Sequence, residues 1–428
     1  MVGRSQALKY HAAIDYAMNK TILMIAFHYP PMKGSSGVLR SLSFTNNLID
    51  YGWTPVVLTV RPEAHPKTGD MSVNEVRKEI EIIRNLAFDA ARHLSFRGIY
   101  PGIFAWPDRW ASWAISAIPS GIKLIKKYKP DVIWSTYPIA TAHLIAYSLK
   151  RISGIPWVAD FRDPMSDDNY ESFIGGKICK LIERGTVKSA DRLIFTTPGA
   201  IRIYQESYPD IPSWKWECIP NGYDEDSFRA AENTIVTDKS INSKITLLHS
   251  GLIYPVERNP SEFFKAISEL HSEGKISPDW LTIMLRASGH DDFCRKQAED
   301  VGIDQYIKMG ASVPYNDSLK EMLSASGLLV FQSSICNQQI PAKIYEYIRA
   351  RKPVLALTDD KGDTAALLKG VGLTNIAPLN NKNEIKNALQ AFINMIREKS
   401  FTPAEDKIIS SMSRINQVKR LAGILDTL

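Results

Sequence analysis

Apolar runs of five to seven residues, alternating with longer helical stretches, limit the folds open to this chain more than any other feature of its sequence. In the first half these runs lie at 22–27, 55–60, 80–86, 131–136, 157–161, 192–197 and 215–219. Stretches with helical periodicity lie between several of them, at 39–51, 115–128 and 141–153. Strands that are apolar throughout and alternate with helices predict a parallel sheet covered by helices on both faces.

The same alternation restarts after the polar segment 230–244. Further strands are predicted at 245–250, 281–286, 307–309, 327–332 and 353–357, with helices around 261–273, 291–301, 319–325 and 342–351. We therefore expect an α/β chain with two doubly wound, Rossmann-like domains. The predicted bounds are 1–19 for an N-terminal extension, 20–229 for the first domain, 230–244 for a linker, 245–400 for the second domain and 401–428 for a C-terminal helix that can cross back to the first domain.

Length and composition exclude several other classes of protein. A chain of 428 residues is too long for one small core, and 44% hydrophobic with 23% charged residues is typical of a globular protein. The net charge of +6 is mild and no basic stripe is interleaved with aromatics, so no nucleic-acid partner is expected. Four cysteines without metal-ligand spacing, and the lack of a signal-peptide or spanning pattern, predict a cytoplasmic protein, either soluble or peripheral on the inner membrane face.

A glycine-rich loop follows the first predicted strand, in the sequence FHYPPMKGSSGVLR. Glycine lets the backbone approach a phosphate, and a helix that starts after such a loop offers free N–H groups. Gly34, Gly37 and Arg40 are therefore candidates for an anion cradle. The same spacing also fits an ordinary strand-to-helix turn.

Two carboxylates flank an arginine at the end of the fifth predicted strand, in VADFRDPM. Alternation along a strand places Asp160 and Arg162 on one side, with Asp163 just beyond the strand. A carboxylate at this edge of a parallel sheet can accept a proton or orient a hydroxyl group. An Arg–Asp ion pair with a helix cap is the structural alternative.

In the second half, the first strand ends in LLHSGLIYPVERNP. Gly251 would allow close approach of the backbone, and Arg258 offers a planar guanidinium suited to phosphate oxygens, although a solvated loop arginine is the alternative. His28 and His249 each follow a strand next to a glycine-containing loop, and either could line a site or be structural.

The segment QSSICNQQIPAKIYEYIRARKPVLAL, residues 332–357, is the most informative one. Pro341 is predicted at the first helical position, and Lys343 and Glu346 follow on one helix face. The helix start at Ala342, together with the charge of Lys343, would attract a diphosphate. Glu346 could accept hydrogen bonds from both hydroxyls of a ribose. The alternative is an ion pair between Lys343 and Glu346.

Taken together in chain order, the segments described above resemble those of the retaining glycosyltransferases of family 4 (group 1), which have the GT-B fold. PPMKGSSGVLR resembles the glycine-rich loop of that family, and WVADFRDP resembles its subgroup that builds bacterial surface polysaccharides. LLHSGLIYPVERNP and IPAKIYEYIRARKPVLA resemble its donor-binding half. The resemblance implies two Rossmann-like domains facing a central cleft, the first binding the acceptor and the second the nucleotide-sugar donor.

The resemblance also implies roles for residues that contact the donor. Of a glutamate pair in the family, Glu346 matches the ribose-binding member, whereas Gln338 stands at the position of the other. Arg258 matches an arginine that grips the diphosphate. Phe263 replaces the lysine usual there, so Lys343 is expected to supply that charge.

A catalytic position in the first domain, often a histidine in the family, falls in ADFRDP at Asp160 or Asp163. The expected site residues are then Asp160, Asp163, Arg258 and Lys343 for catalysis, Gly251, Arg258, Gln338, Pro341, Ala342, Lys343 and Glu346 for the donor, and Gly34, Gly37 and Arg40 for the acceptor or phosphate loop. Neither a metal nor a cofactor is expected, because the nucleotide sugar is a substrate. The implied activity is sugar transfer to a glycan or lipid-linked acceptor; the alternatives are a sugar-nucleotide epimerase or hydrolase and a non-catalytic nucleotide-sugar binder.

Two other patterns leave alternatives open. Asp224-Glu225-Asp226 has the spacing of a metal-binding DxD motif, but it lies in the PNGYDEDSF loop, which does not favour metal binding. Residues 99–129 combine three tryptophans with four later lysines, which is typical of contact with an anionic membrane surface. Packing of the tryptophans inside the first domain explains the same stretch, whose members are Trp106, Trp110, Trp113, Lys123, Lys126, Lys127 and Lys129.

Overall fold

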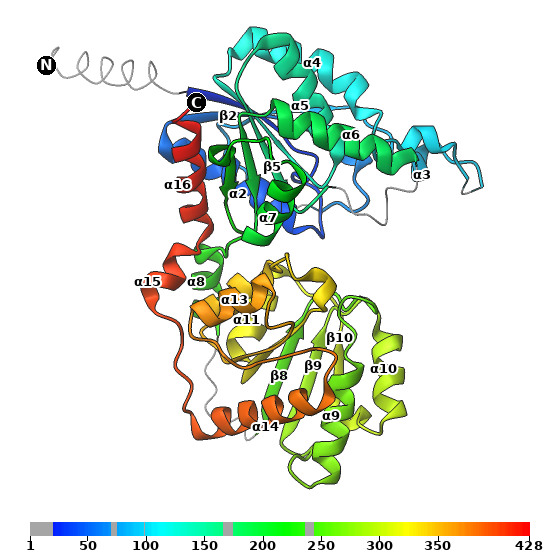
Figure 1. The fold of residues 1–428 in the computed structure, drawn as a ribbon, viewed down its shortest axis with the longest axis vertical. Helices are drawn as coiled ribbons and strands as arrows, with labels where there is room; N and C mark the ends of the chain where they lie inside the picture. Colours follow the sequence, from blue (N-terminus) through cyan, green and yellow to red (C-terminus); the bar gives the residue numbers. More distant parts are fainter. Residues whose placement is uncertain (1–19, 70–74, 98, 166–173, 236–243) are drawn as a thin grey trace, which may run out of the picture. The chain divides into compact units, whose positions relative to one another are not determined.

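The computed structural model describes residues 20–69, 75–97, 99–165, 174–235 and 244–428, so the predicted N-terminal extension at 1–19 lies outside the described residues. The chain divides into two compact units. Unit 1 comprises Met1–Pro220 with Ile415–Leu428, and unit 2 comprises Asn221–Arg414. Each unit holds a sheet flanked by helices (Figure 1).

Unit 1 is built on a parallel sheet of seven strands in the order β3-β2-β1-β4-β5-β6-β7. The strand order changes direction between β1 and β4, and the loops beyond this switch point are where doubly wound sheets bind ligands. The strands are β1 Lys20–Ile25, β2 Trp53–Val60, β3 Glu81–Asn85, β4 Val132–Thr136, β5 Trp157–Arg162, β6 Arg192–Phe195 and β7 Trp216–Cys218.

The helices of unit 1 begin and end at residues suited to helix termini. Ser35 caps α2 by accepting a hydrogen bond from the amide of Gly37, and Gly154 ends α5 with a φ of 74°. The helices are α2 Ser36–Leu48, α3 Ala90–His93, α4 Trp113–Tyr128, α5 Ala140–Ser153, α6 Ile174–Ser189, α7 Pro198–Ser207 and α16 Arg414–Leu425, with 3₁₀ turns η1 Ile49–Tyr51, η2 Pro62–Ala64, η3 Gly102–Ala105 and η4 Ser213–Lys215.

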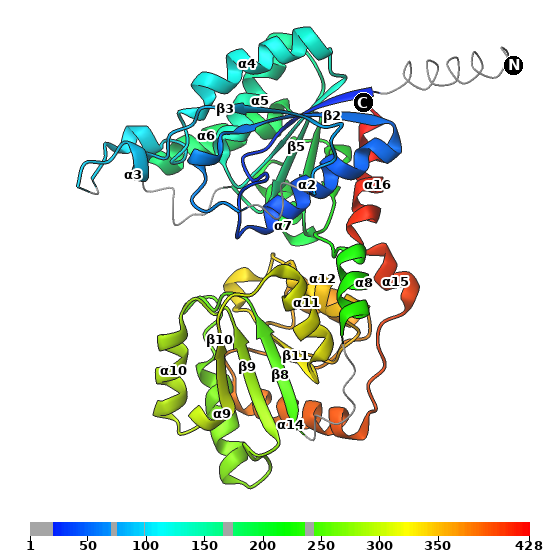
Figure 2. The same ribbon diagram turned by 180° about the vertical axis from the view of Figure 1, so that it is seen from behind.

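Both faces of the unit 1 sheet are covered, which explains why its strands are apolar throughout. Leu23 of β1 belongs to a core shared with α4 and α5, and its neighbour Ile22 belongs to a second core on the opposite face, shared with α2 and α16. Figures 1 and 2 show these two sides in turn. The C-terminal helix therefore packs on unit 1, where Leu421 and Leu425 are buried, as predicted.

Unit 2 repeats the architecture on six parallel strands in the order β10-β9-β8-β11-β12-β13. The strands are β8 Ile245–Ser250, β9 Leu281–Arg286, β10 Ile307–Gly310, β11 Gly327–Phe331, β12 Val354–Leu357 and β13 Ile376–Ala377. The helices are α8 Glu225–Thr234, α9 Ser261–Ser272, α10 Asp291–Asp300, α11 Tyr315–Ser324, α12 Lys343–Arg349, α13 Asp363–Gly370, α14 Lys382–Glu398 and α15 Asp406–Ser411, with 3₁₀ turns η5 Asp304–Tyr306 and η6 Ser334–Cys336. The two parallel sheets confirm the predicted α/β class.

Two boundaries differ from the prediction. The units separate after Pro220 rather than at residue 229, because α8 packs on unit 2: Phe228 is buried there, and Arg349 binds both Glu225 and Glu232. As α8 extends to Thr234, it also covers the start of the predicted linker. The predicted helix at 401–428 is two helices, α15 and α16, and only the chain from Ile415 onward belongs to unit 1.

Helix length and hydropathy bear on contact with membranes. In the described part of the chain, none of the helices combines the length and the apolar character needed to cross a bilayer.

Candidate functional site

In unit 2, the predicted donor-binding residues lie after two neighbouring strands. Gly251 and Arg258 follow β8, whereas Lys343 and Glu346 follow β11 on α12. These two strands pair directly in the sheet, so their loops leave the same edge. The structure therefore brings Gly251 and Lys343 together: a Cβ atom added to Gly251 would lie 3.0 Å from Nζ of Lys343.

A buried histidine fixes the position of the Lys343 ammonium. Nζ of Lys343 lies 3.3 Å from Nε2 of His249, whose Nδ1 lies 3.0 Å from the carbonyl oxygen of Leu329. A carbonyl oxygen only accepts, so Nδ1 carries the proton of the neutral ring and Nε2 accepts from the ammonium. Burial, reinforced by the charge of Lys343, lowers the pKa of His249 well below its usual value and keeps the ring neutral at pH 7.

Lys343 and Arg258 together form a positively charged centre. Burial, reinforced by the nearby charge of Arg258, lowers the pKa of Lys343 from 10.5 to about 7. Arg258 donates from Nη1 to the carbonyl oxygen of Leu252 at 2.9 Å, and its guanidinium lies 5.3 Å from the ring centre of Tyr254. Among the described residues, neither Arg258 nor Lys343 forms an ion pair with a carboxylate. Two neighbouring cations without a paired acid favour an anionic ligand.

Glu346 is buried one turn further along α12 and has its own partners. Its Oε1 accepts a hydrogen bond of 2.8 Å from the hydroxyl of Tyr315, and Nη2 of Arg414 lies 3.8 Å from the same atom. Burial raises the pKa of Glu346, and Arg414 acts in the opposite direction. Lys343 and Glu346 thus have different partners, and a simple ion pair between them does not describe the arrangement.

The start of α12 differs in detail from the prediction. The helix begins at Lys343, so Pro341 precedes it by two residues instead of occupying its first position. The carbonyl oxygens of Pro341 and Ala342 already accept from the amides of Ile344 and Tyr345, at 2.9 and 3.2 Å, in a tighter turn than an α-helix has. Gln338 is partly exposed in the loop before this turn.

Two neighbours of Glu346 are not among the residues predicted from the sequence. Tyr315 begins α11, and Arg414 begins α16, far along the chain. Tyr315 reaches Glu346 because α11 and α12 share a core in unit 2, and Arg414 is the last residue of unit 2 before the chain passes into unit 1. No local pattern marks either residue, since neither belongs to a glycine-rich loop or a helix start with polar spacing.

In unit 1, two predicted site residues bind one another. Arg40 donates from Nε and Nη2 to the two carboxylate oxygens of Asp160, at 2.9 and 3.1 Å. Its Nη1 donates to the carbonyl oxygen of Pro220 at 3.1 Å, and Thr136 donates to Asp160 at 3.2 Å. Asp160 is fully buried and Arg40 nearly so, and this geometry is that of the ion-pair alternative.

Arg162 has a strained backbone at the end of β5. Its φ is 61°, in the left-handed region that residues with a side chain rarely adopt, and the pairing with β6 shifts register between Asp160 and Arg162. Simple alternation along the strand therefore does not hold here. The guanidinium nevertheless faces α2, because a Cβ on Gly37 would overlap both it and the ring of His28. Such strain is common at functional sites.

His28 completes this cluster. Its Nδ1 lies 2.8 Å from Oγ of Ser35, the cap of α2, and burial together with the charge of Arg162 lowers its pKa to about 3. The ring is therefore neutral at pH 7. Gly37 is required by the close approach of these side chains, which is a different reason from the predicted approach to a phosphate.

Gly34 and Asp163 are the remaining predicted site residues of unit 1. Gly34 has a φ of 83° and open space around its Cα, so glycine there serves the conformation of the loop. Asp163 is exposed, and its amide donates to the carbonyl oxygen of Phe161 at 2.7 Å. Asp160 is thus fully buried and Asp163 is exposed as a residue, although burial raises the pKa of the Asp163 carboxyl.

The DxD spacing at 224–226 has a structural explanation. Asp224 caps α8, its Oδ1 accepting a hydrogen bond of 2.8 Å from the amide of Ser227. Glu225 is engaged by Arg349. Groups of three possible metal ligands are not found within the part of the chain that the structure describes.

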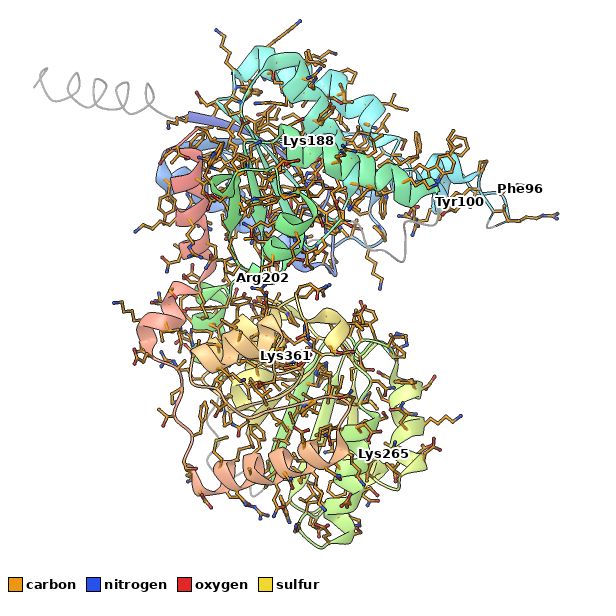
Figure 3. All side chains as sticks on the ribbon, in the orientation of Figure 1. Phe96, Tyr100, Lys188, Arg202, Lys265 and Lys361 are labelled. Atoms are coloured by element: carbon orange, nitrogen blue, oxygen red, sulfur yellow. The ribbon has the colours of Figure 1, made fainter. Side chains whose placement is uncertain are left out.

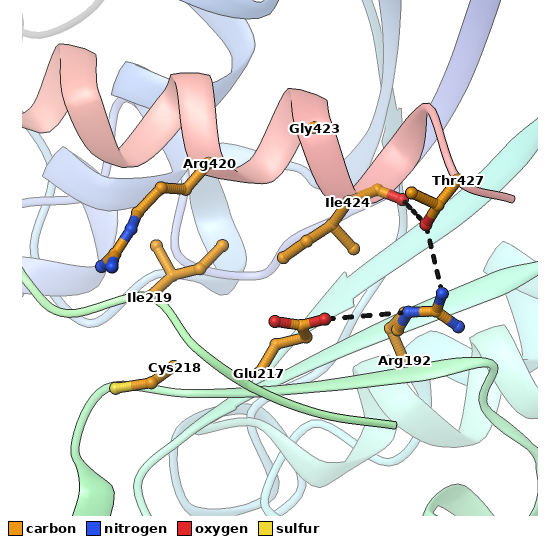
Figure 4. A pocket seen from close by; sticks show the side chains of 8 residues that line it. All are labelled: Arg192, Glu217, Cys218, Ile219, Arg420, Gly423, Ile424 and Thr427. Atoms are coloured by element: carbon orange, nitrogen blue, oxygen red, sulfur yellow. Dashed lines mark hydrogen bonds and ion pairs between the residues drawn. The ribbon is translucent and has the colours of Figure 1, made fainter. Parts of the chain in front are cut away.

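One pocket of unit 1 lies apart from these residues. It has a volume of about 300 Å³ and lies between α16 and the strands β6 and β7 (Figure 4). Its lining residues are Arg192, Glu217, Cys218, Ile219, Arg420, Gly423, Ile424 and Thr427. It contains none of the predicted site residues, and Arg192 already donates to Thr427 at 3.1 Å.

Comparison with known proteins gives a family match over part of the chain and a fold for the whole of it. Residues 43–227 match the family model described as Glycosyltransferase Family 4, whereas no curated protein matches the sequence. The solved structure of sucrose-phosphate synthase from Thermosynechococcus elongatus has a TM-score of 0.58 at 13% identity, covering 95% of both chains. Anabaena HepE in complex with UDP and glucose has a TM-score of 0.65 at 13% identity, covering 96% of this chain and 100% of that one.

A third similar structure is WaaG, a glycosyltransferase involved in lipopolysaccharide biosynthesis. Its TM-score is 0.60 at 15% identity, and the match covers 94% of this chain and 99% of that one. At such identities the likeness establishes the fold alone. Together with the two parallel sheets, these neighbours confirm the predicted two-domain GT-B fold.

Proposed function

We propose that the chain transfers a sugar from a nucleoside diphosphate sugar to a glycan or lipid-linked acceptor, from the premise that residues 43–227 match the Glycosyltransferase Family 4 model. One observation carries the proposal: Lys343 lies against Gly251 in the loop after β8, and the same loop carries Arg258, so the two residues form a positive centre. A diphosphate has the charge and size to bind two such cations. The complex of HepE with UDP and glucose supports a nucleotide sugar as the donor class.

The chemistry of the leaving group explains why this centre matters. When the bond between the anomeric carbon and the diphosphate breaks, negative charge develops on the departing oxygen. Positive groups already in place stabilise that charge in the transition state. Arg258 and Lys343 can supply this stabilisation themselves, so we propose transfer that needs no metal ion, with retention of the anomeric configuration.

The geometry of unit 1 favours different roles for its two carboxylates. Both oxygens of Asp160 are engaged by Arg40, so Asp160 acts as a positioning residue for α2 and β5. Asp163 is exposed just beyond the strand and is available to an acceptor hydroxyl. We assign the acceptor contact to Asp163. The resemblance of ADFRDP supports an acceptor in bacterial surface polysaccharide synthesis, with the protein acting in the cytoplasm.

The test is nucleotide binding by a lysine variant with a matched control. UDP and a panel of nucleotide sugars are titrated calorimetrically into the wild-type protein, Lys343→Met and Lys265→Met. Lys265 is an exposed lysine of the same unit, paired with Glu262 on α9 (Figure 3). We expect Lys343→Met to weaken UDP binding by about tenfold or more, because a buried charge-assisted contact is lost, and Lys265→Met to bind normally. Equal binding by all three proteins would contradict the proposal.

Turnover distinguishes the alternatives. An epimerase or hydrolase would convert the donor without any acceptor, whereas a transferase releases the nucleotide at an appreciable rate only when an acceptor is supplied. A non-catalytic binder, suggested by Gln338 at the position of a glutamate, would bind the donor and release nothing under either condition.

A further inference from the structure

We propose that unit 1 docks on a lipid surface with anionic head groups through the described residues 86–97 and 99–104, here called the apolar projection. Seven large apolar side chains of this segment are exposed: Leu86, Phe88, Leu94, Phe96, Ile99, Ile103 and Phe104. Figure 3 shows Phe96 and Tyr100 at the far end of this segment, away from the sheet. Exposed clusters of this kind mark sites of interaction.

The end of the projection presents two of these side chains together. Phe96 and Ile99 exchange backbone hydrogen bonds of 2.9 and 3.1 Å, and Arg97, which follows Phe96, has a φ of 52°. Residues that form such an antiparallel pair point their side chains to the same face. Phe96 is 77% and Ile99 78% exposed, so both side chains can enter an apolar phase without breaking these hydrogen bonds.

The base of the projection is held firmly by polar contacts. Asp89 is fully buried, caps α3 through the amide of Ala91, and is bound by Arg109 at 2.9 and 2.7 Å. The indole of Trp110 donates to the carbonyl oxygen of Ala64 at 3.0 Å. These contacts therefore fix the backbone from which the exposed apolar side chains extend.

For two of the three tryptophans in 99–129, the alternative of packing inside the first domain applies. Trp113 is fully buried in the core of unit 1, and Trp110 packs against that core. The lysines of α4 follow Trp113 by ten or more residues, which on a helix rising 1.5 Å per residue is about 15 Å or more away. Trp113 and these lysines therefore do not form one patch, and the proposal rests on the exposed phenylalanines of the projection.

Charge favours a lipid surface over other partners. The acidic residue within 86–104 is Asp89, which is buried and paired, whereas Arg92 and Arg97 are exposed. The guanidinium of Arg97 lies 5.5 Å from the ring centre of Phe96, so cation and apolar side chains share the tip. Aromatic and aliphatic side chains next to arginine fit the boundary between acyl chains and anionic head groups.

Co-sedimentation with vesicles tests the proposal. The wild-type protein is mixed with vesicles of phosphatidylcholine alone and of an equimolar mixture with phosphatidylglycerol. We expect binding to the anionic vesicles, weaker when salt is raised from about 0.1 M to about 1 M, because the Debye length falls from about 10 Å to about 3 Å. The double variant Phe96→Ser/Ile99→Ser is expected to bind at least about tenfold more weakly, since two apolar side chains no longer enter the bilayer.

Matched variants separate docking from general surface hydrophobicity. Ile152→Ser removes a side chain that is 60% exposed at the end of α5 and should bind like the wild type. Arg97→Ser should reduce the preference for anionic vesicles while keeping the apolar contribution. Tryptophan fluorescence melting checks that each variant is folded.

Three outcomes would overturn the docking proposal: no binding of the wild type to anionic vesicles, equal binding by the double variant, or a change in self-association by light scattering without a change in vesicle binding. UDP titration of the double variant should match the wild type. A failure of UDP binding in every protein would instead count against the proposed glycosyltransferase function and leave the docking result standing.

Discussion

The buried pair between Arg40 and Asp160 links the two segments of unit 1 that carry its candidate residues. The type of each residue and its place at a strand end could be predicted from the sequence, and the ion pair was one of two explanations left open. Which one applies depends on the distance between α2 and β5, and the tertiary structure alone sets that distance. The structure gives bidentate geometry with both groups buried.

Replacing the carboxylate of this pair should destabilise unit 1. Asp160→Asn leaves the buried guanidinium of Arg40 without its counter-charge, and we expect a loss of about 3–5 kcal/mol in the free energy of unfolding. Asp50→Asn breaks the exposed bidentate pair with Arg77, at 2.8 and 2.8 Å, and should cost less than about 1 kcal/mol. Tryptophan fluorescence during urea unfolding reports on unit 1, which contains all nine tryptophans except Trp280. An Asp160→Asn protein of normal stability without transferase activity would instead identify Asp160 as the catalytic carboxylate.

The pKa of Lys343 predicts how donor binding depends on pH. With a pKa of about 7, the lysine loses its charge in the free protein as the pH rises from 7 to 9. Because an anionic donor binds the protonated form, the apparent Kd of UDP should rise by up to about tenfold per pH unit in this range. Calorimetry between pH 7 and 9 measures the slope, and Lys343→Met should flatten it. A Kd that stays constant for the wild type would show that Lys343 does not contact the nucleotide.

In the protein without ligand, a rise in pH has the opposite effect: it favours the folded state of unit 2 instead of weakening an interaction. The folded-state pKa lies below the ordinary 10.5, so between pH 7 and 10 the unfolded chain binds more protons at this residue than the folded chain does. Lys343 therefore makes a contribution to the stability of unit 2 that becomes more favourable as the pH rises through this window.

At the scale of elements, α2 shows what a sequence pattern can and cannot reveal. The glycines of PPMKGSSGVLR correctly predicted a turn into a helix. Ser35 caps that helix, and Gly37 gives room to Arg162 and His28. That second requirement comes from β5 and β1, which pack on the helix, so local sequence could not predict it.

A single methyl group on α2 tests this packing. In Gly37→Ala the new Cβ would overlap the Arg162 guanidinium and the His28 ring, and we expect a loss of about 1–3 kcal/mol in stability from overpacking. Gly423→Ala on α16 meets open space and should raise stability by up to about 1 kcal/mol, because alanine favours the helix. Thermal unfolding followed by tryptophan fluorescence compares the two. Equal melting temperatures would show that Arg162 and His28 move aside at little cost.

At the scale of the whole molecule, the C-terminus completes the first unit of the chain. α16 covers one face of the unit 1 sheet through Val418, Leu421 and Leu425, opposite α4 and α5. Helical character at 401–428 could be predicted from the sequence. The break between α15 and α16 could not, because it depends on which unit each helix packs against.

Truncating one side chain of α16 should therefore lower the stability of β1 and β2, which lie at the other end of the sequence. Leu421→Ala leaves a cavity against β1 and β2, and we expect a loss of about 2–5 kcal/mol. Ile415→Ala, on the same helix but 46% exposed, should have little effect. Hydrogen exchange of the β1 and β2 amides measures the change, and unit 2 serves as the internal reference. Unchanged protection in Leu421→Ala would contradict the role given to α16.

The sequence by itself determined the α/β class, the two parallel sheets, and the residue types at the carboxyl ends of their strands. It could do so because strand and helix periodicity, turn residues and helix caps act over a few neighbouring positions. Only the tertiary structure decided that Lys343 meets His249, that Glu346 meets Tyr315 and Arg414, and that Asp160 is held by Arg40. It also decided that Trp113 is buried while Phe96 is exposed. These outcomes depend on desolvation and on distances between segments far apart in the chain, and both arise only when the helices pack on their sheets.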